Sequence, residues 1–273
     1  MQEIVSHPWF RYVIGGLAIG IFVLRYFLQG MKETSNAPVK FAASESSSLS
    51  DQQKFSIALN AVISSYSNVD TNILSFTKNG KKSRQVDTYL KRWRINTREG
   101  YLGLTDYYFT DGRRAYFNFI YPLFKSAPRE EWNTKMQEQF GDNERAQRIL
   151  TVFDKHKIID YWKSEGIIEF DSDVEIGSLG WDISNLIGQA RRAFTAQLIT
   201  EEEAWDIIGR ATAMAKENFN SWEEFGKSMI IGFTIDMFKR KDIDAHYLED
   251  SVRIYKLTVT DPTSPWNTIE WQK

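Results

Sequence analysis

The sequence predicts a mainly α-helical protein in which a single N-terminal transmembrane helix is followed by a compact multi-helix domain. Three observations predict this class: one long apolar run near the N-terminus, apolar residues spaced three and four apart along most of the remaining chain, and two Ser/Thr-x-x-Glu capping signals. The 273 residues include nine Trp and eighteen Phe, enough for one domain with a sizeable core. We therefore expect an anchor over residues 1–33, a linker over 34–50 and a mainly helical domain over 51–273.

The apolar run Tyr12–Leu28 is just long enough to cross a bilayer, which requires a helix of about 17–25 apolar residues. Trp9 and Tyr26 stand where an aromatic belt would lie, and Arg25 can extend its side chain to the interface. A cleaved signal peptide is the alternative. The single basic Arg11 before the run and the lack of a small-residue cleavage site favour an uncleaved, single-pass anchor.

The charges around this run indicate its direction. Arg11 precedes it, whereas Arg25, Lys32 and Lys40 lie at its end or after it. The positive-inside rule thus favours a cytoplasmic C-terminal domain, with a periplasmic one as the alternative. The absence of Cys excludes a lipoprotein anchor, disulfides and thiolate chemistry.

The Ser-rich stretch Thr34–Ser50 buries little apolar surface and is typical of a linker. Ser50 is a suitable cap for the first helix after it. The periodicity then predicts helices over Asp51–Tyr66, Arg84–Ile95, Arg98–Tyr108, Arg129–Phe140, Asn143–Lys163 and Asp182–Leu198.

Capping boxes predict the starts of two further helices. Thr200 with Glu203 opens one that continues to Met214, and Ser221 with Glu224 opens Phe225–Lys239. Only Ile167–Phe170 and Tyr255–Thr260 have a strand-like pattern. No repeat of fixed period is present.

Several motifs in the second half of the chain carry a resemblance to a known family. They are Gly180-Trp181-Asp182, Ala190-Arg191-Arg192, Leu198–Trp205, Phe219–Phe225, Gly232 and Ser264–Trp271, with a looser match from Tyr89 to Arg113. In order and spacing, this part of the chain from about Val86 resembles the uncharacterised bacterial proteins grouped as domain of unknown function twelve-sixty-six (YbeU/YbeR-like). It departs from that pattern after Gly232, where Phe233-Thr234 stand in place of a basic residue and an aromatic one. The resemblance implies a compact, mainly helical domain and implies no activity.

Asp182 is the leading candidate for chemistry. As a catalytic acid, base or ligand it would take Arg191 or Arg192 as a charge partner for an anionic substrate. The favoured interpretation makes Asp182 the N-cap of the following helix, accepting from Ser184 or Asn185, because Asp is among the best N-caps. Arg192 lies ten positions on and cannot pair with Asp182 along one helix.

Two other residue groups have an ordinary structural interpretation. Asp242, His246 and Asp250 share a helix face, but the two ends of this set are about 12 Å apart, too far for one ion. A solvated acidic face explains them, and we expect no metal and no cofactor. Four tryptophans suit core packing better than an aromatic ligand pocket; these are Trp205, Trp222, Trp266 and Trp271.

The one concentrated basic region runs from Lys78 to Arg98. Anionic lipid head groups are one possible partner, and nucleic acid is another, expected to be unlikely at a net charge of −2. The third interpretation is a solvated face that pairs with the acidic stretch Glu165–Glu175. The binding candidates are Lys81, Lys82, Arg84, Lys91, Arg92 and Arg94.

The sequence contains no Gly-rich phosphate loop, no Gly-x-Ser-x-Gly elbow and no His-Glu-x-x-His motif. We therefore expect a non-enzymatic protein that binds a protein partner at the inner membrane of a bacterium. An enzyme using Asp182, and a lipid- or nucleic-acid-binding module using the basic region, are the alternatives.

Overall fold

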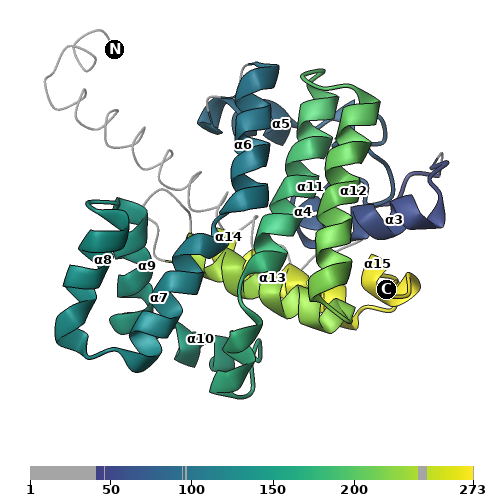
Figure 1. Ribbon diagram of the computed structural model, residues 1–273. Coiled ribbons are helices and arrows are strands. Elements are labelled where there is room, and N and C mark those ends of the chain that lie inside the picture. The colour runs from purple at the N-terminus through teal and green to yellow at the C-terminus, as the bar shows by residue number, and fades with distance from the viewer. Residues whose placement is uncertain (1–40, 46, 94, 96, 239–244, 273) are drawn as a thin grey trace, which may run out of the picture. The chain divides into compact units, whose positions relative to one another are not determined.

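The computed structural model describes residues 41–45, 47–93, 95, 97–238 and 245–272. All of them lie in a compact unit that begins at Lys40. The first part of this unit contains α3 (Asp51–Ala58), α4 (Ala61–Tyr66), β1 (Thr77–Lys78), β2 (Lys81–Lys82), α5 (Arg84–Trp93), α6 (Arg98–Thr110) and α7 (Arg114–Ser126) (Figure 1). The remainder contains η1 (Arg129–Glu131), α8 (Trp132–Phe140), α9 (Glu144–Asp154), α10 (Ile158–Ser164), η2 (Asp171–Ile176), α11 (Leu179–Thr195), α12 (Glu201–Asn218), α13 (Trp222–Met237), α14 (Ala245–Thr260) and α15 (Pro265–Thr268).

Helix α11 is the centre of the fold. It contacts α12 and α13 most extensively and also touches α4, α5 and α6. Every residue from Gly180 to Ala193 is buried, including Asp182 and Arg191. Glycine permits the closest of these contacts, because a Cβ on Gly180 would lie 2.7 Å from the backbone of α13. A helix buried on all sides has no solvated face, so its polar side chains must find partners inside the protein.

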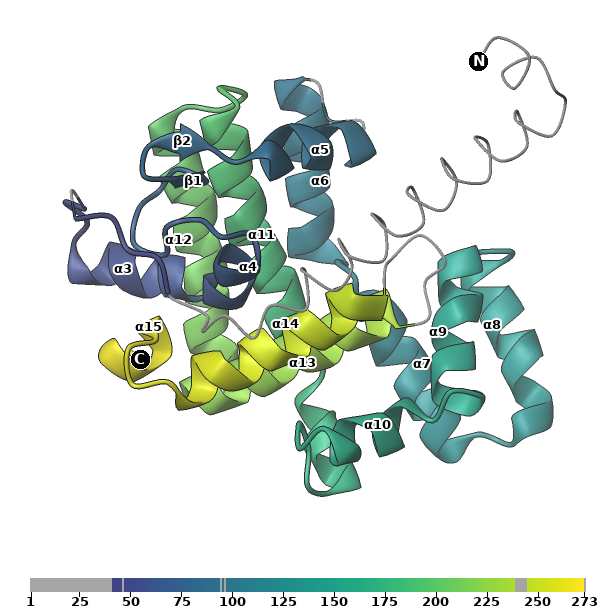
Figure 2. The same ribbon diagram turned by 180° about the vertical axis from the view of Figure 1, so that it is seen from behind.

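A second layer of structure covers one end of α11. The antiparallel hairpin β1–β2 turns at Asn79-Gly80, both with positive φ, and α5 follows directly. From behind, the hairpin and α5 lie at the same end as the turn between α11 and α12 (Figure 2). Val69, Phe76 and Val86 form a small core beneath this layer.

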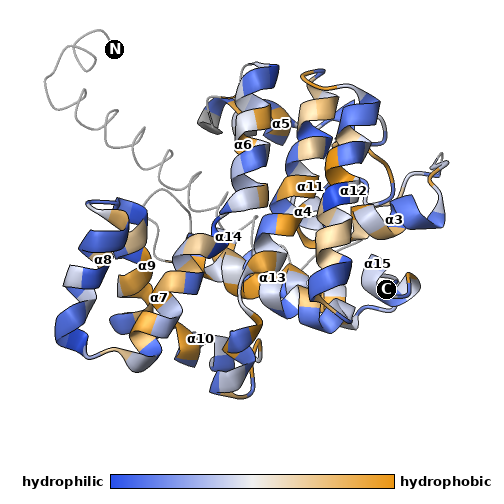
Figure 3. Cartoon of the chain, viewed as in Figure 1, coloured by the Kyte–Doolittle hydropathy of each residue, from blue (hydrophilic) through white to orange (hydrophobic). Residues whose placement is uncertain are grey.

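Helices α7 to α10 form their own aromatic cluster. Apolar segments of α7, α9 and α10 face one another (Figure 3). Phe153 is at the centre, with Phe117 and Trp162 at centroid distances of 6.3 and 6.1 Å. The buried Trp162 Nε1–H donates to Thr234 Oγ1 of α13 at 2.7 Å, which ties this cluster to the central helices.

The C-terminal tryptophans pack onto the core, as expected. Trp266 is buried, stacks on Trp222 at 5.6 Å and donates its Nε1–H to Ala58 O at 2.8 Å. Trp222 donates to Ile269 O at 2.7 Å, and Trp271 meets Phe55 edge to face. These contacts hold α15 against α3 and α13.

The predicted fold class is right in its helical part and wrong in its transmembrane helix. Across the described ranges, no helix is both long and apolar enough to cross a membrane. The longest, α12, carries five charged side chains in its first ten residues. The predicted span Tyr12–Leu28, with the orientation and the localisation expected from it, lies outside the described residues. The architecture is therefore corrected to a mainly helical domain.

Other corrections concern element boundaries. Asp51–Tyr66 divides into α3 and α4 at Leu59-Asn60, and Asn143–Lys163 divides where Lys157 adopts positive φ. Tyr255–Thr260, expected as a strand, belongs to α14, and Ile167–Phe170 forms neither helix nor strand. The predicted caps Ser50, Thr200 and Ser221 each accept from the N–H three residues on.

Residues of the predicted linker also make contacts with the domain. Thr71 donates its backbone N–H to Ala42 O at 2.8 Å, and Ser44 donates to Asn72 Oδ1 at 2.7 Å. Ser47 Oγ donates to Asn72 O at 2.5 Å. These bonds hold Ala42, Ser44 and Ser47 against the loop between α4 and β1.

Candidate functional site

Asp182 lies in the first turn of α11 and is completely buried. Its two carboxylate oxygens accept the backbone N–H groups of Arg113 and Arg114, each at 3.0 Å, and Arg114 Nη1 at 3.1 Å. Arg113 is the N-cap of α7, and Arg114 is its first residue. The predicted N-cap role within its own helix is therefore wrong, because α11 begins three residues before Asp182. Asp182 instead caps the N-terminus of a different helix.

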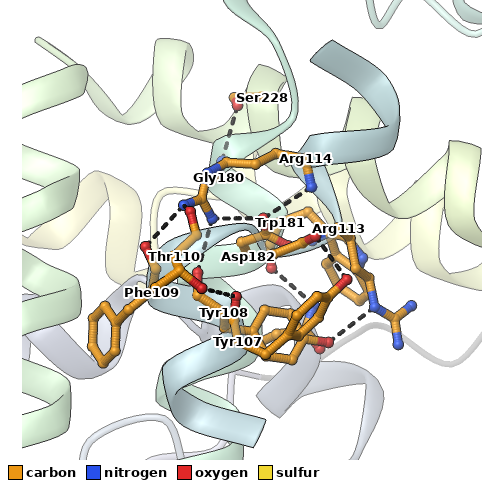
Figure 4. A network of polar contacts seen from close by, with 12 residues as sticks. Tyr107, Tyr108, Phe109, Thr110, Arg113, Arg114, Gly180, Trp181, Asp182 and Ser228 are labelled. Carbon is orange, nitrogen blue, oxygen red and sulfur yellow. Dashed lines mark hydrogen bonds and ion pairs between the residues drawn. The ribbon is translucent and has the colours of Figure 1, made fainter. Parts of the chain in front are cut away.

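Arg114 joins this cap to the end of the preceding helix. Its guanidinium donates to the carbonyl oxygens of Tyr108, Phe109 and Thr110 at 2.8 to 2.9 Å, which are the last carbonyls of α6. Figure 4 shows Arg114 between these carbonyls and Asp182. One carboxylate and one guanidinium thus satisfy both helix ends that meet at this junction.

The turn between the two helices needs a glycine. Gly112 has φ +62°, and a Cβ there would lie 2.1 Å from Asp182 Oδ2. Tyr107 Oη donates to Gly112 O at 2.7 Å, which fixes the turn from the other side. The Asp182 carboxylate therefore fills the space that a side chain at position 112 would need.

Burial raises the pKa of Asp182, and the Arg113 and Arg114 donors oppose that rise. A neighbouring ion pair between Arg113 and Asp236 is also buried, and Arg113 Nε donates to Tyr108 Oη at 2.9 Å. No oxygen of Asp182 is exposed to solvent. The arrangement can hold two helices together, and it presents no carboxylate to a substrate.

Arg191, the second candidate, is equally buried but lies near the other end of α11. It donates to three backbone carbonyls of the segment between α4 and β1: Leu74 O at 3.2 Å, Asp70 O at 2.6 Å and Ser75 O at 3.2 Å. Asn60 Oδ1 and Ser64 Oγ accept further bonds. Burial and the adjacent Arg192 lower the pKa of Arg191 to about 9.

Arg192 does not meet Asp182 either. Its guanidinium lies over the Phe76 ring at 4.1 Å from the centroid, and Arg191 lies 5.3 Å from the same ring. The structure therefore places Asp182 at the α6–α7 junction and both arginines under the β1–β2 hairpin. The three residues proposed to act together do not form one site.

The predicted basic region is exposed on the hairpin and α5. Lys81, Arg84 and Lys91 are exposed and have no ion-pair partner among the described residues. Lys82 pairs with Asp87 at 2.6 Å, and Arg98 pairs with Glu203 of α12. The side chain of Arg92 and the whole of Arg94 lie outside what the structure describes. We call Lys81, Lys82, Arg84 and Lys91 the basic face.

The acidic stretch Glu165–Glu175 is not the partner of this face. Glu165 pairs with Lys256, Asp171 with Lys163 at 2.8 Å, and Glu175 with Lys125. These lysines come from α14, α10 and α7. The predicted pairing with Lys78–Arg98 is therefore wrong, since the acidic stretch finds its counter-ions locally.

A small open pocket lies beside the basic face, at the turn between α11 and α12. Its volume is about 310 Å³, at the lower end for a small-molecule site. It is lined by Arg98, Phe194, Gln197, Leu198, Ile199, Thr200 and Glu203.

Neither the pocket nor the network suggests a metal. Within the described ranges, no three His, Cys, Asp or Glu side chains come together as ligands. His246 pairs with Glu249 at 3.5 Å, and Asp242 lies outside the described residues.

Most of the predicted tryptophans pack as core residues, whereas Trp205 donates to Glu201 of its own helix.

The sequence interpretation missed the residues that organise the junction. Gly112, Arg113 and Arg114 fall between two aromatic-rich runs, and Asp111-Gly112 is a common turn signal that marks the end of one helix. Asn79-Gly80 between two lysine-containing pairs is the corresponding hairpin signal. Both signals were present and could have located the two turns.

Comparison with known proteins agrees with the expected resemblance. The family model of a protein of unknown function (DUF1266) matches residues 90–271, two thirds of the chain. No curated protein and no solved structure gives a significant match. The bacterial origin and the YbeU/YbeR likeness stay predictions, whereas the extent of the match settles the family itself. The chain belongs to the DUF1266 family.

Proposed function

We propose that this domain is a non-catalytic binding module whose basic face takes an acidic segment of a protein partner. The observation that carries the proposal is that Lys81, Arg84 and Lys91 are exposed and have no counter-ion within the described part of the chain. By contrast, Asp182 and Arg191, two of the charged residues that resembled a catalytic set, are buried and hydrogen-bonded to backbone groups.

The basic face is mounted rigidly. Asp70 Oδ2 accepts the N–H of Asn79 in the hairpin turn at 3.0 Å, and Asp70 O accepts from Arg191 at 2.6 Å. Phe76 N donates to Thr195 Oγ1 of α11 at 2.7 Å. A surface held this way loses little entropy on binding, which favours a specific partner.

The distribution of charge favours a protein over a polyanion. Asp87 lies within the face, and Glu201 and Glu202 are exposed at the start of α12 beyond the pocket. Mixed signs repel a continuous row of phosphates but suit a protein that places its carboxylates one by one. The sequence pI of about 6.0 agrees with this preference.

The test is binding of a labelled acidic peptide to the full chain, measured by fluorescence anisotropy at low and high salt. The variants Lys81→Glu, Arg84→Glu and Lys91→Glu should each weaken binding several-fold, and added salt should weaken binding to the wild type. The matched control is Lys155→Glu, which makes the same charge change at an exposed lysine after α9.

Two results would overturn the proposal. One is equal weakening by Lys155→Glu, which would mean that only net charge matters. The other is tighter binding of anionic lipid vesicles or of single-stranded RNA than of the acidic peptide through the same residues.

A further inference from the structure

We propose that the pocket between α11 and α12 receives Phe170 from a second copy of this chain, so that copies associate head to tail. The inference rests on the proposed function of the basic face and names the partner of that face: the exposed Glu169, which precedes Phe170.

Phe170 is an unusual surface residue. It is 59% exposed, and only Val259 joins it as an exposed large hydrophobic side chain in the described part of the chain. A single exposed apolar side chain is common on protein surfaces, so Phe170 counts only together with the pocket and the charges described below. Aromatic side chains are nevertheless frequent among the central anchors of interfaces.

The segment around Phe170 is held in one conformation. Asp173 Oδ2 accepts the backbone N–H groups of Glu169 and Phe170 at 2.8 and 3.2 Å, and these bonds lower the pKa of Asp173. Lys163 pairs with Asp171 at 2.8 Å on the other side. The ring therefore projects from a preorganised turn, which reduces the entropy lost when it is buried.

The pocket offers the complementary surface. Phe194, Leu198 and Ile199 supply its apolar lining, and Arg98 stands on its rim. Its volume of about 310 Å³, at the lower end for a small-molecule site, is sufficient for one aromatic side chain. Thr195, the neighbour of the pocket-lining Phe194, accepts the backbone N–H of Phe76, the residue before β1. The pocket therefore adjoins the segment that leads into the hairpin.

Charge supports the same pairing. Glu169, next to Phe170, is exposed and has no ion-pair partner among the described residues. The same holds for Lys81 on β2 and for Arg84 and Lys91 on α5. The acidic stretch lies near α10 and α13, whereas the pocket lies at the far end of α11 (Figure 1). Phe170 and the pocket therefore lie on different parts of one copy, and an interface that joins them is heterologous.

A heterologous interface makes a distinctive prediction for mixtures. The variant Phe170→Ala keeps an intact pocket, and Leu198→Glu keeps the Phe170 side chain. Each alone should lose self-association by about tenfold or more, whereas an equal mixture of the two should form a one-to-one pair that grows no further. Sedimentation velocity of the full chain over a concentration series measures all three states.

Matched variants keep the test decisive. Val259→Ala removes the other exposed apolar side chain and should leave association unchanged. Leu198 is partly buried, so Leu198→Glu could disturb the fold. Gln197→Glu therefore serves as a second pocket variant, because Gln197 is exposed and lines the same pocket. Normal association by Phe170→Ala or by Gln197→Glu would overturn the inference.

The result also separates this inference from the proposed function. If the acidic peptide binds the basic face but Phe170→Ala and wild type associate equally, the basic face serves another partner and the head-to-tail contact is wrong. If the charge-reversal variants change neither peptide binding nor self-association, both proposals fail.

Discussion

The two ends of α11 bury opposite charges in opposite ways. Asp182 in the first turn collects N–H groups from the start of α7, and Arg191 near the last turn collects carbonyl oxygens from the segment before β1. In both cases most of the hydrogen-bond partners of the charged side chain are backbone groups. A buried charge in this fold therefore connects chain segments that have no regular hydrogen bonds of their own.

The two ends differ in how the charge is compensated. Asp182 has a guanidinium at 3.1 Å, so its charge is balanced as well as hydrogen-bonded. Arg191 hydrogen-bonds several neutral acceptors and lies against the Phe76 ring. The nearby Asp70 carboxylate favours its charge but forms no ion pair with it among the described residues. We therefore expect substitutions of Arg191 to lower the free energy of unfolding more than substitutions of Asp182. Water cannot easily replace Arg191 as the donor to the buried carbonyl oxygens.

The largest effect is expected for Arg191→Leu. Two buried carbonyls and a partly buried one lose their donor. The free energy of unfolding should therefore fall by about 3–5 kcal/mol, even though a buried charge is removed at the same time. Arg191→Lys should recover only part of this loss, because an ammonium cannot reproduce the fork of five N–H groups. Urea denaturation measures both, and the exposed Arg84→Ala should change stability by less than about 0.5 kcal/mol.

The next effect tests Asp182. Asp182→Ala should cost about 2–4 kcal/mol, and Asp182→Asn about 1.5–3 kcal/mol, because an amide loses the charge-assisted bonds to α7 and turns an N–H toward donors. A simple N-cap would instead tolerate Asn at little cost. The exposed Asp206→Asn is the control, and a near-neutral Asp182→Asn would contradict the junction described above.

Gly112→Ala is expected to cost about 2–3 kcal/mol, from the left-handed backbone together with the contact to Asp182. In the Asp182→Ala background the same change should cost less, because the clash is gone. Gly103→Ala is the control of opposite sign: Gly103 lies within α6 with nothing near its absent Cβ, so alanine should add about 0.5–1 kcal/mol. An additive double mutant would show that the two sites are independent.

The smallest effect concerns pH at the same junction. Burial raises the pKa of Tyr107 to about 12, above the ordinary value of 10.0. The folded state therefore favours the neutral phenol, so this contribution to stability is complete below about pH 10 and is lost as the pH rises toward about 12. Denaturation midpoints across this window should fall less steeply for Tyr107→Phe than for the wild type. Parallel slopes would remove Tyr107 from the network.

The interpretation of Asp182 shows where sequence reasoning reached its limit. The residue was expected to cap its own helix, whereas the helix that it caps lies almost seventy positions earlier in the chain. Local spacing contains no information about such a partner, since only packing brings α7 to the start of α11. The basic region shows the reverse case: exposure of Lys81, Arg84 and Lys91 follows from local polarity, and the structure agrees.

Secondary structure divides along the same line. The caps Ser50, Thr200 and Ser221 were predictable because they depend on residues three positions apart. The helix over Tyr255–Thr260 was missed because its β-branched residues favour a strand locally, and packing of α14 against α4 and α13 overrides that preference.

The sequence by itself determined what short-range physics controls: the helical class, the capped helix starts, the exposed basic residues and the family. Tertiary structure alone decided which buried charge meets which backbone segment, that Asp182 and Arg191 serve separate junctions, and that a pocket forms beside the basic face. The physical reason is range. Helix propensity and capping act within one or two turns, whereas a buried charge is satisfied by whatever segment the completed packing places within hydrogen-bond distance.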